Sequence, residues 1–149
     1  MSDIEIVKHL RDITGLSLGQ IKKALDEAGG DKARAMEILK AHGILVAEKK
    51  SSRQVKEGMV DAYIHSTKKL GVLVEVLCET DFVARNAEFQ KLTHDLAMHV
   101  AAAKPGTVED FLSQQFIKDQ DITVKELINQ YIAKLGENIQ IGRFEIFEI

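Results

Sequence analysis

The spacing of apolar residues changes near Gly58, and this change constrains the fold more than any other feature of the sequence. Before it, apolar side chains recur every three or four residues, as on one face of an α-helix. After it, two short runs are typical of β-strands, at 59–64 and 72–77, before helical spacing returns. The sequence therefore predicts an all-helical first unit followed by a unit that mixes strands and helices.

Local signals divide the first unit, residues 1–46, into three short helices. Capping boxes begin at Ser2 and Ser17, where the serine is followed three positions later by Glu or Gln. Asp31 is expected to cap the third helix, which we expect to stop at Gly43. Three helices of this length predict a minimal bundle around one small apolar cluster.

Residues 47–57 have little apolar content and indicate a connector, either a loop or a solvated helix. We therefore place the boundary between the two domains in this segment. A phosphate-binding patch is one interpretation of its basic residues, but no aromatic residues alternate with them, so a solvated linker is favoured. These basic residues are Lys49, Lys50, Arg53 and Lys56.

The second unit, residues 58–149, combines strands with helices. The two strand-like runs predict a β-hairpin, and residues 138–149 alternate well enough for a closing strand. The apolar phase changes within this last strand, which a bulge at Gly142 and Arg143 would reconcile. The predicted fold class is α+β, with a three-helix bundle joined to a three-stranded antiparallel sheet packed with helices. Helices of the second unit are expected to be capped by Asn86, Thr107 and Thr123.

Composition excludes several classes of function. Lys and Arg number 20 against 23 Asp and Glu, and the net charge of −3 gives no general attraction to nucleic acid or anionic lipid. No apolar run is long enough to span a membrane, and the charged N-terminal residues do not form a secretory signal. The only cysteine, Cys78, cannot form an intrachain disulfide, so we expect a cytoplasmic protein.

No group of side chains in the sequence indicates catalysis. There is no phosphate-binding glycine-rich loop. His94 and His99 would lie about 140° apart around a helix, so they cannot bind one metal ion from one face. Cys78 ends an apolar run without a histidine at a telling spacing, which favours a buried, inert thiol. We therefore expect a protein that is not an enzyme and that carries neither a cofactor nor a metal ion.

The corner after the second predicted strand contains Thr80, Asp81, Phe82 and Val83. By pattern alone, Phe82 and Val83 would be core residues that close a connection from strand to helix. Thr80 or Asp81 would cap the turn. On these grounds an exposed binding segment is the less favoured interpretation.

Four motifs support a different interpretation of this corner. They are Leu-Arg-Asp-Ile-Thr-Gly at 10–15, Cys-Glu-Thr-Asp-Phe-Val-Ala-Arg-Asn at 78–86, Ala-Met-His-Val-Ala-Ala at 97–102 and Ile-Ala-Lys-Leu-Gly-Glu-Asn-Ile at 132–139. In these motifs, in their order and over nearly the whole chain, the sequence resembles the elongation factor Ts family.

The resemblance implies a guanine nucleotide exchange factor for elongation factor Tu in translation elongation. The first unit would be a module of the ubiquitin-associated type that docks on the nucleotide-binding domain of this partner, without binding ubiquitin. The segment Thr80 to Val83 would insert into GDP-bound elongation factor Tu and disturb its magnesium site, so that GDP leaves. The helix that contains Met98 and His99 would lie beside the partner-facing surface.

The sequence departs from longer relatives between Pro105 and the helix at Thr123, which only a short connection separates. Longer relatives carry a second half of the core and a helical hairpin there. Pairing into a homodimer, as in shorter relatives, stays open. The alternative function is a binding adaptor without exchange activity, associated with RNA or nascent chains through the helical bundle and the basic linker.

Overall fold

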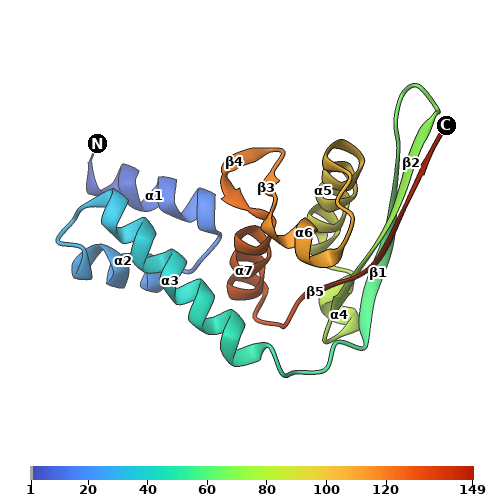
Figure 1. Cartoon of the computed structure of the whole chain (residues 1–149). Helices are drawn as coiled ribbons and strands as arrows, with labels where there is room; N and C mark the ends of the chain where they lie inside the picture. The colour runs from blue at the N-terminus through green and yellow to red at the C-terminus, as the bar shows by residue number, and fades with distance from the viewer. Residues whose placement is uncertain (1) are drawn as a thin grey trace.

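A computed structural model describes residues 2–149 (Figure 1). In this part of the chain, three helices come first and a mixed region of strands and helices follows. The helices are α1 (Asp3–Thr14), α2 (Leu18–Glu27), α3 (Lys32–Lys50), α4 (Asp81–Ala84), α5 (Ala87–Ala103), α6 (Val108–Ser113) and α7 (Val124–Leu135). The strands are β1 (Glu57–Ile64), β2 (Leu70–Cys78), β3 (Gln115–Phe116), β4 (Asp119–Thr123) and β5 (Gln140–Glu148). The predicted α+β class is confirmed.

The first three helices pack around a small apolar cluster. Both predicted capping boxes are formed, because the Ser2 and Ser17 hydroxyls each accept a hydrogen bond from a backbone N–H three residues later. Leu10, Ile21 and Ala35 are fully buried inside the cluster. These side chains hold together helices that would be only marginally stable alone.

Helix α3 does not stop at Gly43, which corrects our prediction. The helix continues to Lys50 and includes the first residues of the predicted linker. Gly43 is buried, and a Cβ atom on it would lie 3.8 Å from the Asn129 carbonyl oxygen of α7. The glycine therefore marks a close approach of two helices rather than a helix end.

The larger sheet is antiparallel with the strand order β1-β2-β5. Strands β1 and β2 form the predicted hairpin in continuous register. Between β2 and β5 the register shifts at Glu75, which faces both Gly142 and Arg143. The predicted bulge is therefore confirmed, and the Glu75 carboxylate accepts a hydrogen bond from the Arg143 backbone N–H at 3.3 Å.

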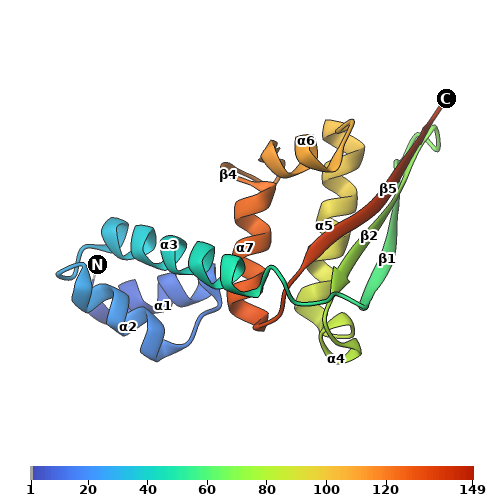
Figure 2. The ribbon, with the colours of Figure 1, turned by 60° about the horizontal axis from the view of Figure 1, so that its bottom comes forward.

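One face of this sheet is covered and the other is open. Helix α5 packs on β1 and β2 at the covered face, where Val72, Val74 and Val76 are buried. Figures 1 and 2 show α7 between α5 and α3. Because α3 packs against α7, the N-terminal helices are joined to the second unit through this helix pair.

Helices α5, α6 and α7 begin after their predicted caps, but the small hairpin of β3 and β4 was not predicted. Strand β3 has only two residues, Gln115 and Phe116, which is too short to show alternation in the sequence. Phe116 is buried in the main core, with its ring centroid 6.0 Å from that of His99. The hairpin therefore closes the core between α6 and α7.

Candidate functional site

The corner after β2 is a single helical turn, α4, at one end of the sheet (Figure 2). Of the two predicted caps, Thr80 and Asp81, the residue that caps this turn is Thr80. Its Oγ1 accepts a hydrogen bond from the Val83 backbone N–H at 3.3 Å. Asp81 forms an ion pair with Arg85 in which Oδ2 and Nε are 2.8 Å apart. The backbone of the turn and its charged side chains are therefore held locally.

Phe82 points away from the protein. Its side chain is 83% exposed, whereas Val83 is 5% exposed and packs in the main core. The pattern-based expectation of two core residues is confirmed for Val83 and wrong for Phe82. Successive residues of a helix differ by about 100° in direction, so a one-turn helix that buries Val83 and Ala84 leaves Phe82 on the outside.

Met98 and His99, the candidates on α5, lie in different environments. Met98 is partly exposed, but His99 is fully buried between Phe111 and Phe116, with centroid distances of 5.5 and 6.0 Å. His99 therefore packs inside the core of the free protein, and the position of α5 beside a partner stays a prediction in which Met98 is the more accessible residue. Because α5 lies between the sheet and the β3–β4 hairpin, this face of the helix is turned into the core.

Two hydrogen bonds select the protonation state of His99. Nδ1 accepts from the Ile117 backbone N–H at 3.2 Å, so Nε2 carries the hydrogen that is donated to Gln114 Oε1 at 2.9 Å. Burial lowers the pKa of His99 below its usual value, against the opposing effect of Gln114. The side chain is therefore neutral near pH 7.

A set of polar contacts at the C-terminal end of α7 holds the start of α4. One carboxylate, that of Glu137, accepts from the backbone N–H groups of Glu79 and Thr80 and from the Thr80 hydroxyl. The Glu79 carboxylate in turn accepts from the Asn138 backbone N–H at 2.7 Å. Glu137 was not among the predicted site residues, because no local spacing connects it to Thr80, 57 positions earlier.

Cys78 is buried at the end of β2, as predicted. Burial, with a contribution from the nearby Glu137 carboxylate, raises the pKa of its thiol to about 11. At neutral pH the thiolate, which is the reactive form, is therefore scarce. Within residues 2–149, no three His, Cys, Asp or Glu side chains are grouped so that they could hold a metal ion.

The basic residues near the predicted linker take part in contacts within the chain. Lys50 donates a hydrogen bond to the Gly136 carbonyl oxygen, and the Arg53 guanidinium lies 3.8 Å from the Glu79 carboxylate. Asn138 Nδ2 donates to the Arg53 carbonyl oxygen at 2.8 Å. These contacts bind the linker to the second unit and weaken its interpretation as a free phosphate-binding patch.

A further exposed apolar patch lies on the N-terminal helices. Ile4 is 81% exposed on α1 and shares a shallow hollow with Leu18 of α2, whose side chain is also exposed. Lys8 and Arg11 line the same hollow. In Figure 2 the α1–α2 connection and α4 both lie on the lower side of the molecule.

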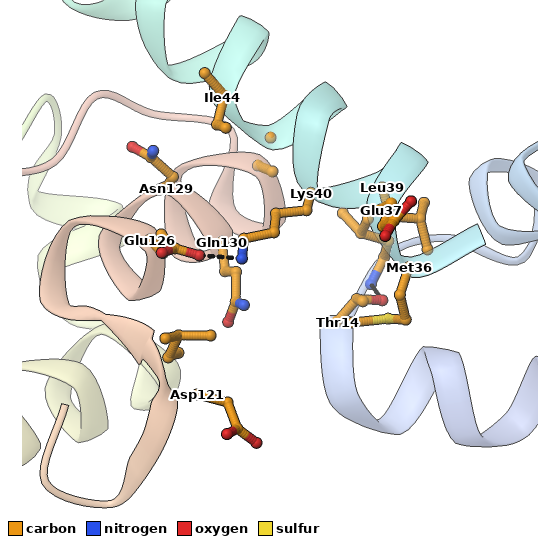
Figure 3. Close-up of a pocket in the computed structure, with 14 residues that line it drawn as sticks. Thr14, Met36, Glu37, Leu39, Lys40, Ile44, Asp121, Glu126, Asn129 and Gln130 are labelled. Carbon is orange, nitrogen blue, oxygen red and sulfur yellow. Dashed lines mark hydrogen bonds and ion pairs between the residues drawn. The ribbon is translucent and has the colours of Figure 1, made fainter. Parts of the chain in front are cut away.

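A cavity of about 260 Å³ separates part of α3 from α7 and β4 (Figure 3). The Lys40–Glu126 ion pair spans it and joins the two helices. The hydrogen bond from Lys40 lowers the pKa of Glu126. The cavity is therefore a gap in the contact between the two units that a charged pair bridges.

No helix of the described residues is long and apolar enough to cross a membrane.

Comparisons with known proteins agree with the motifs in the sequence. A family model described as elongation factor TS matches residues 79–149, which include every element from α4 to β5. Elongation factor Ts of Carboxydothermus hydrogenoformans is 40% identical over 190 aligned positions, which cover 97% of this chain and 88% of the relative. Because 190 positions exceed the 149 residues of the chain, the alignment includes residues of the relative that this chain lacks.

Two other relatives give the same result. Elongation factor Ts of Acetivibrio thermocellus is 40% identical, with 99% of this chain and 90% of the relative covered. Elongation factor Ts of Synechococcus sp. (strain JA-3-3Ab) is also 40% identical, with 97% of this chain and 68% of the relative covered. At this identity and coverage, the chain belongs to the elongation factor Ts family.

Proposed function

We propose that this chain is a guanine nucleotide exchange factor for elongation factor Tu, which binds the GDP-bound partner in the cytoplasm and promotes GDP release. The observation that carries the proposal is the 83% exposure of Phe82 on a turn whose backbone is held in place. A large aromatic side chain kept in water on a fixed turn is typical of a residue that is buried on binding a partner.

Exchange of this kind requires the factor and GDP to compete through the shape of the partner. If the factor weakens GDP binding, GDP weakens binding of the factor to the same extent. Burial of one Phe side chain provides about 1.5–3 kcal/mol, whereas nanomolar nucleotide binding corresponds to about 12 kcal/mol. Phe82 therefore needs a wider docking surface, which we assign to the N-terminal patch around Ile4 and Leu18 together with the surface near α4.

In this proposal, Phe82 acts as a wedge that fits only the nucleotide-free arrangement of elongation factor Tu. Asp81 lies next to it and is exposed, so on insertion its carboxylate can exchange Arg85 for hydrogen-bond donors of the partner. Thr80 and Val83 hold the turn, and the partly exposed Met98 would lie beside the contact. No bond is made or broken by this chain, so the proposed activity is not enzymatic.

The direct test measures release of fluorescently labelled GDP from elongation factor Tu, with and without this chain. Acceleration that increases with the concentration of the chain and then saturates supports the proposal. If GDP release is unchanged while the chain is recovered with RNA or nascent chains, the alternative of a non-exchanging adaptor replaces it.

Self-association is a second proposed property, favoured by the open face of the sheet. Val60, Leu73 and Phe147 are exposed there, and their strand register places them on the same side. We assign this face to a second copy of the chain, because exposed apolar side chains on one side of a sheet form a surface that two identical chains can bury against each other. Sedimentation of the wild type and of Leu73→Lys tests the assignment, and a monomeric wild type would contradict it.

A further inference from the structure

The orientation of Phe82 depends on how the ends of α4 are held. A four-residue helix is too short to be stable by itself. Phe82 has little packing of its own, so the direction of its ring follows the backbone of the turn. Val83 and Ala84 are anchored in the core. What holds the other end, at Thr80, therefore decides where Phe82 points.

Glu137 holds this end with both carboxylate oxygens. Oε1 accepts hydrogen bonds from the backbone N–H groups of Glu79 and Thr80, at 3.1 and 3.0 Å. Oε2 accepts from the Thr80 hydroxyl at 2.6 Å. The same hydroxyl accepts from the Val83 N–H, so it connects Glu137 directly to the cap of α4. Bonds to an ionised carboxylate are stronger than bonds between neutral groups.

The segment that carries Glu137 is itself fixed. It follows α7, which ends at Gly136 in a left-handed conformation. The next residue, Asn138, is buried and donates from its side chain to the Arg53 carbonyl oxygen. Its backbone N–H donates to the Glu79 carboxylate, so two carboxylates connect the chain segments at 79–80 and 137–138 in both directions.

We propose that Glu137 is a positioning residue for nucleotide exchange, which fixes the start of α4 so that Phe82 meets the partner in its productive orientation. This inference rests on the proposed function. Glu137 acts through Thr80 rather than by its own contact with the partner. Its loss is therefore expected to affect the rate of GDP release at saturation more than the concentration needed to reach saturation.

The first test needs no partner and compares amide hydrogen exchange in wild type and Glu137→Gln. The N–H groups of residues 83–86 are hydrogen-bonded within the turn. They are expected to exchange about tenfold faster in the variant, while those of α5 and β2 stay unchanged. Unchanged exchange at 83–86 overturns the inference, and so does faster exchange throughout the core, because Glu137 would then support the fold in general.

The second test measures GDP release from elongation factor Tu over a range of factor concentrations. For Glu137→Gln the maximal rate is expected to fall roughly tenfold, with a half-saturating concentration within about twofold of wild type. Thr80→Val, which removes the hydroxyl that donates to Glu137 Oε2, is expected to lower the maximal rate as well. In the double variant, the combined effect of Thr80→Val and Glu137→Gln should be less than the sum of their separate effects, since both change the hydrogen bond between the Thr80 hydroxyl and Glu137. Glu109→Gln, a change of an exposed carboxylate on α6, is the matched control.

Phe82→Ala, measured beside these variants, separates the inference from the proposed function. If Phe82→Ala slows GDP release and Glu137→Gln does not, the positioning role is overturned while the proposed function stands. If neither variant slows release, the wedge mechanism is wrong and the positioning role in exchange is overturned with it.

Discussion

Truncation of Phe82 should separate binding from folding. In Phe82→Ala the removed ring is 83% exposed, so the free energy of unfolding is expected to stay within about 0.5 kcal/mol of wild type. Full burial of a Phe side chain is worth about 1.5–3 kcal/mol, and 83% of this range, about 1.2–2.5 kcal/mol, is the part still available for a partner. At 1.36 kcal/mol per factor of ten, the acceleration of GDP release should fall about 8- to 70-fold.

The assay follows labelled GDP leaving elongation factor Tu in excess unlabelled nucleotide, at several concentrations of the variant. Thermal unfolding of the free variant is measured in parallel. Leu45→Ala is the control, because Leu45 is another exposed apolar residue, on α3 and far along the chain from α4. It is expected to leave both GDP release and unfolding unchanged.

Two results would refute the reasoning about Phe82. Wild-type GDP release from Phe82→Ala would mean that the exposed ring is not the wedge. A loss of several kcal/mol in unfolding free energy would mean that the ring contributes to the core of the free protein, contrary to its exposure.

Three further predictions concern the core. The pKa of His99 is lowered in the folded state, so the unfolded chain binds a proton more readily, and the stability that neutral His99 provides is complete above about pH 6.5 and is lost as the pH falls below it. Urea unfolding at about pH 7.5 and 5.0 measures this loss of stability, which should be smaller in His99→Gln. Gly58 has φ +152° and its Cβ position is filled by the Val76 carbonyl oxygen, so Gly58→Ala should lower the free energy of unfolding by roughly 2–4 kcal/mol; an unchanged urea midpoint would contradict this. Cys78, with a pKa of about 11 and no exposure, should react with a thiol reagent at pH 8 only at the rate of unfolding, and fast reaction without urea would contradict its burial.

Local chemistry accounts for most of the elements that the sequence predicted correctly. The capping residues Ser2, Ser17 and Asp31 act on N–H groups within three positions of themselves, so they can be recognised without knowledge of the fold. The bulge at Gly142 was also predictable, because it is recorded as a change of apolar phase within one strand. In each case the cause and its effect lie in the same short segment.

Contacts between distant segments account for the errors. Gly43 resembles a helix end, yet α3 continues through it because α7 packs closely at that point. The burial of His99 could not be predicted from its own helix, because it depends on Phe111 and on the unpredicted β3–β4 hairpin. A sequence pattern gives the periodicity of each element and not the identity of the element that covers it.

The surroundings of Phe82 depend both on local signals and on contacts with distant segments. The sequence pattern could therefore locate the turn at Thr80 to Val83 but could not predict that Phe82 is exposed. Thr80 marks the turn locally, and Val83 is buried, as expected of an apolar residue in a connection from strand to helix. Whether Phe82 is also buried depends on a rotation of about 100° within one helical turn. Burial of Val83 and Ala84 fixes that rotation, and the start of the turn is held by Glu137, 57 residues from Thr80. Exposure of a large aromatic side chain to water is unfavourable, and here the turn that exposes it is held by a distant carboxylate. Such a departure from the usual burial of aromatic residues is expected at a functional residue.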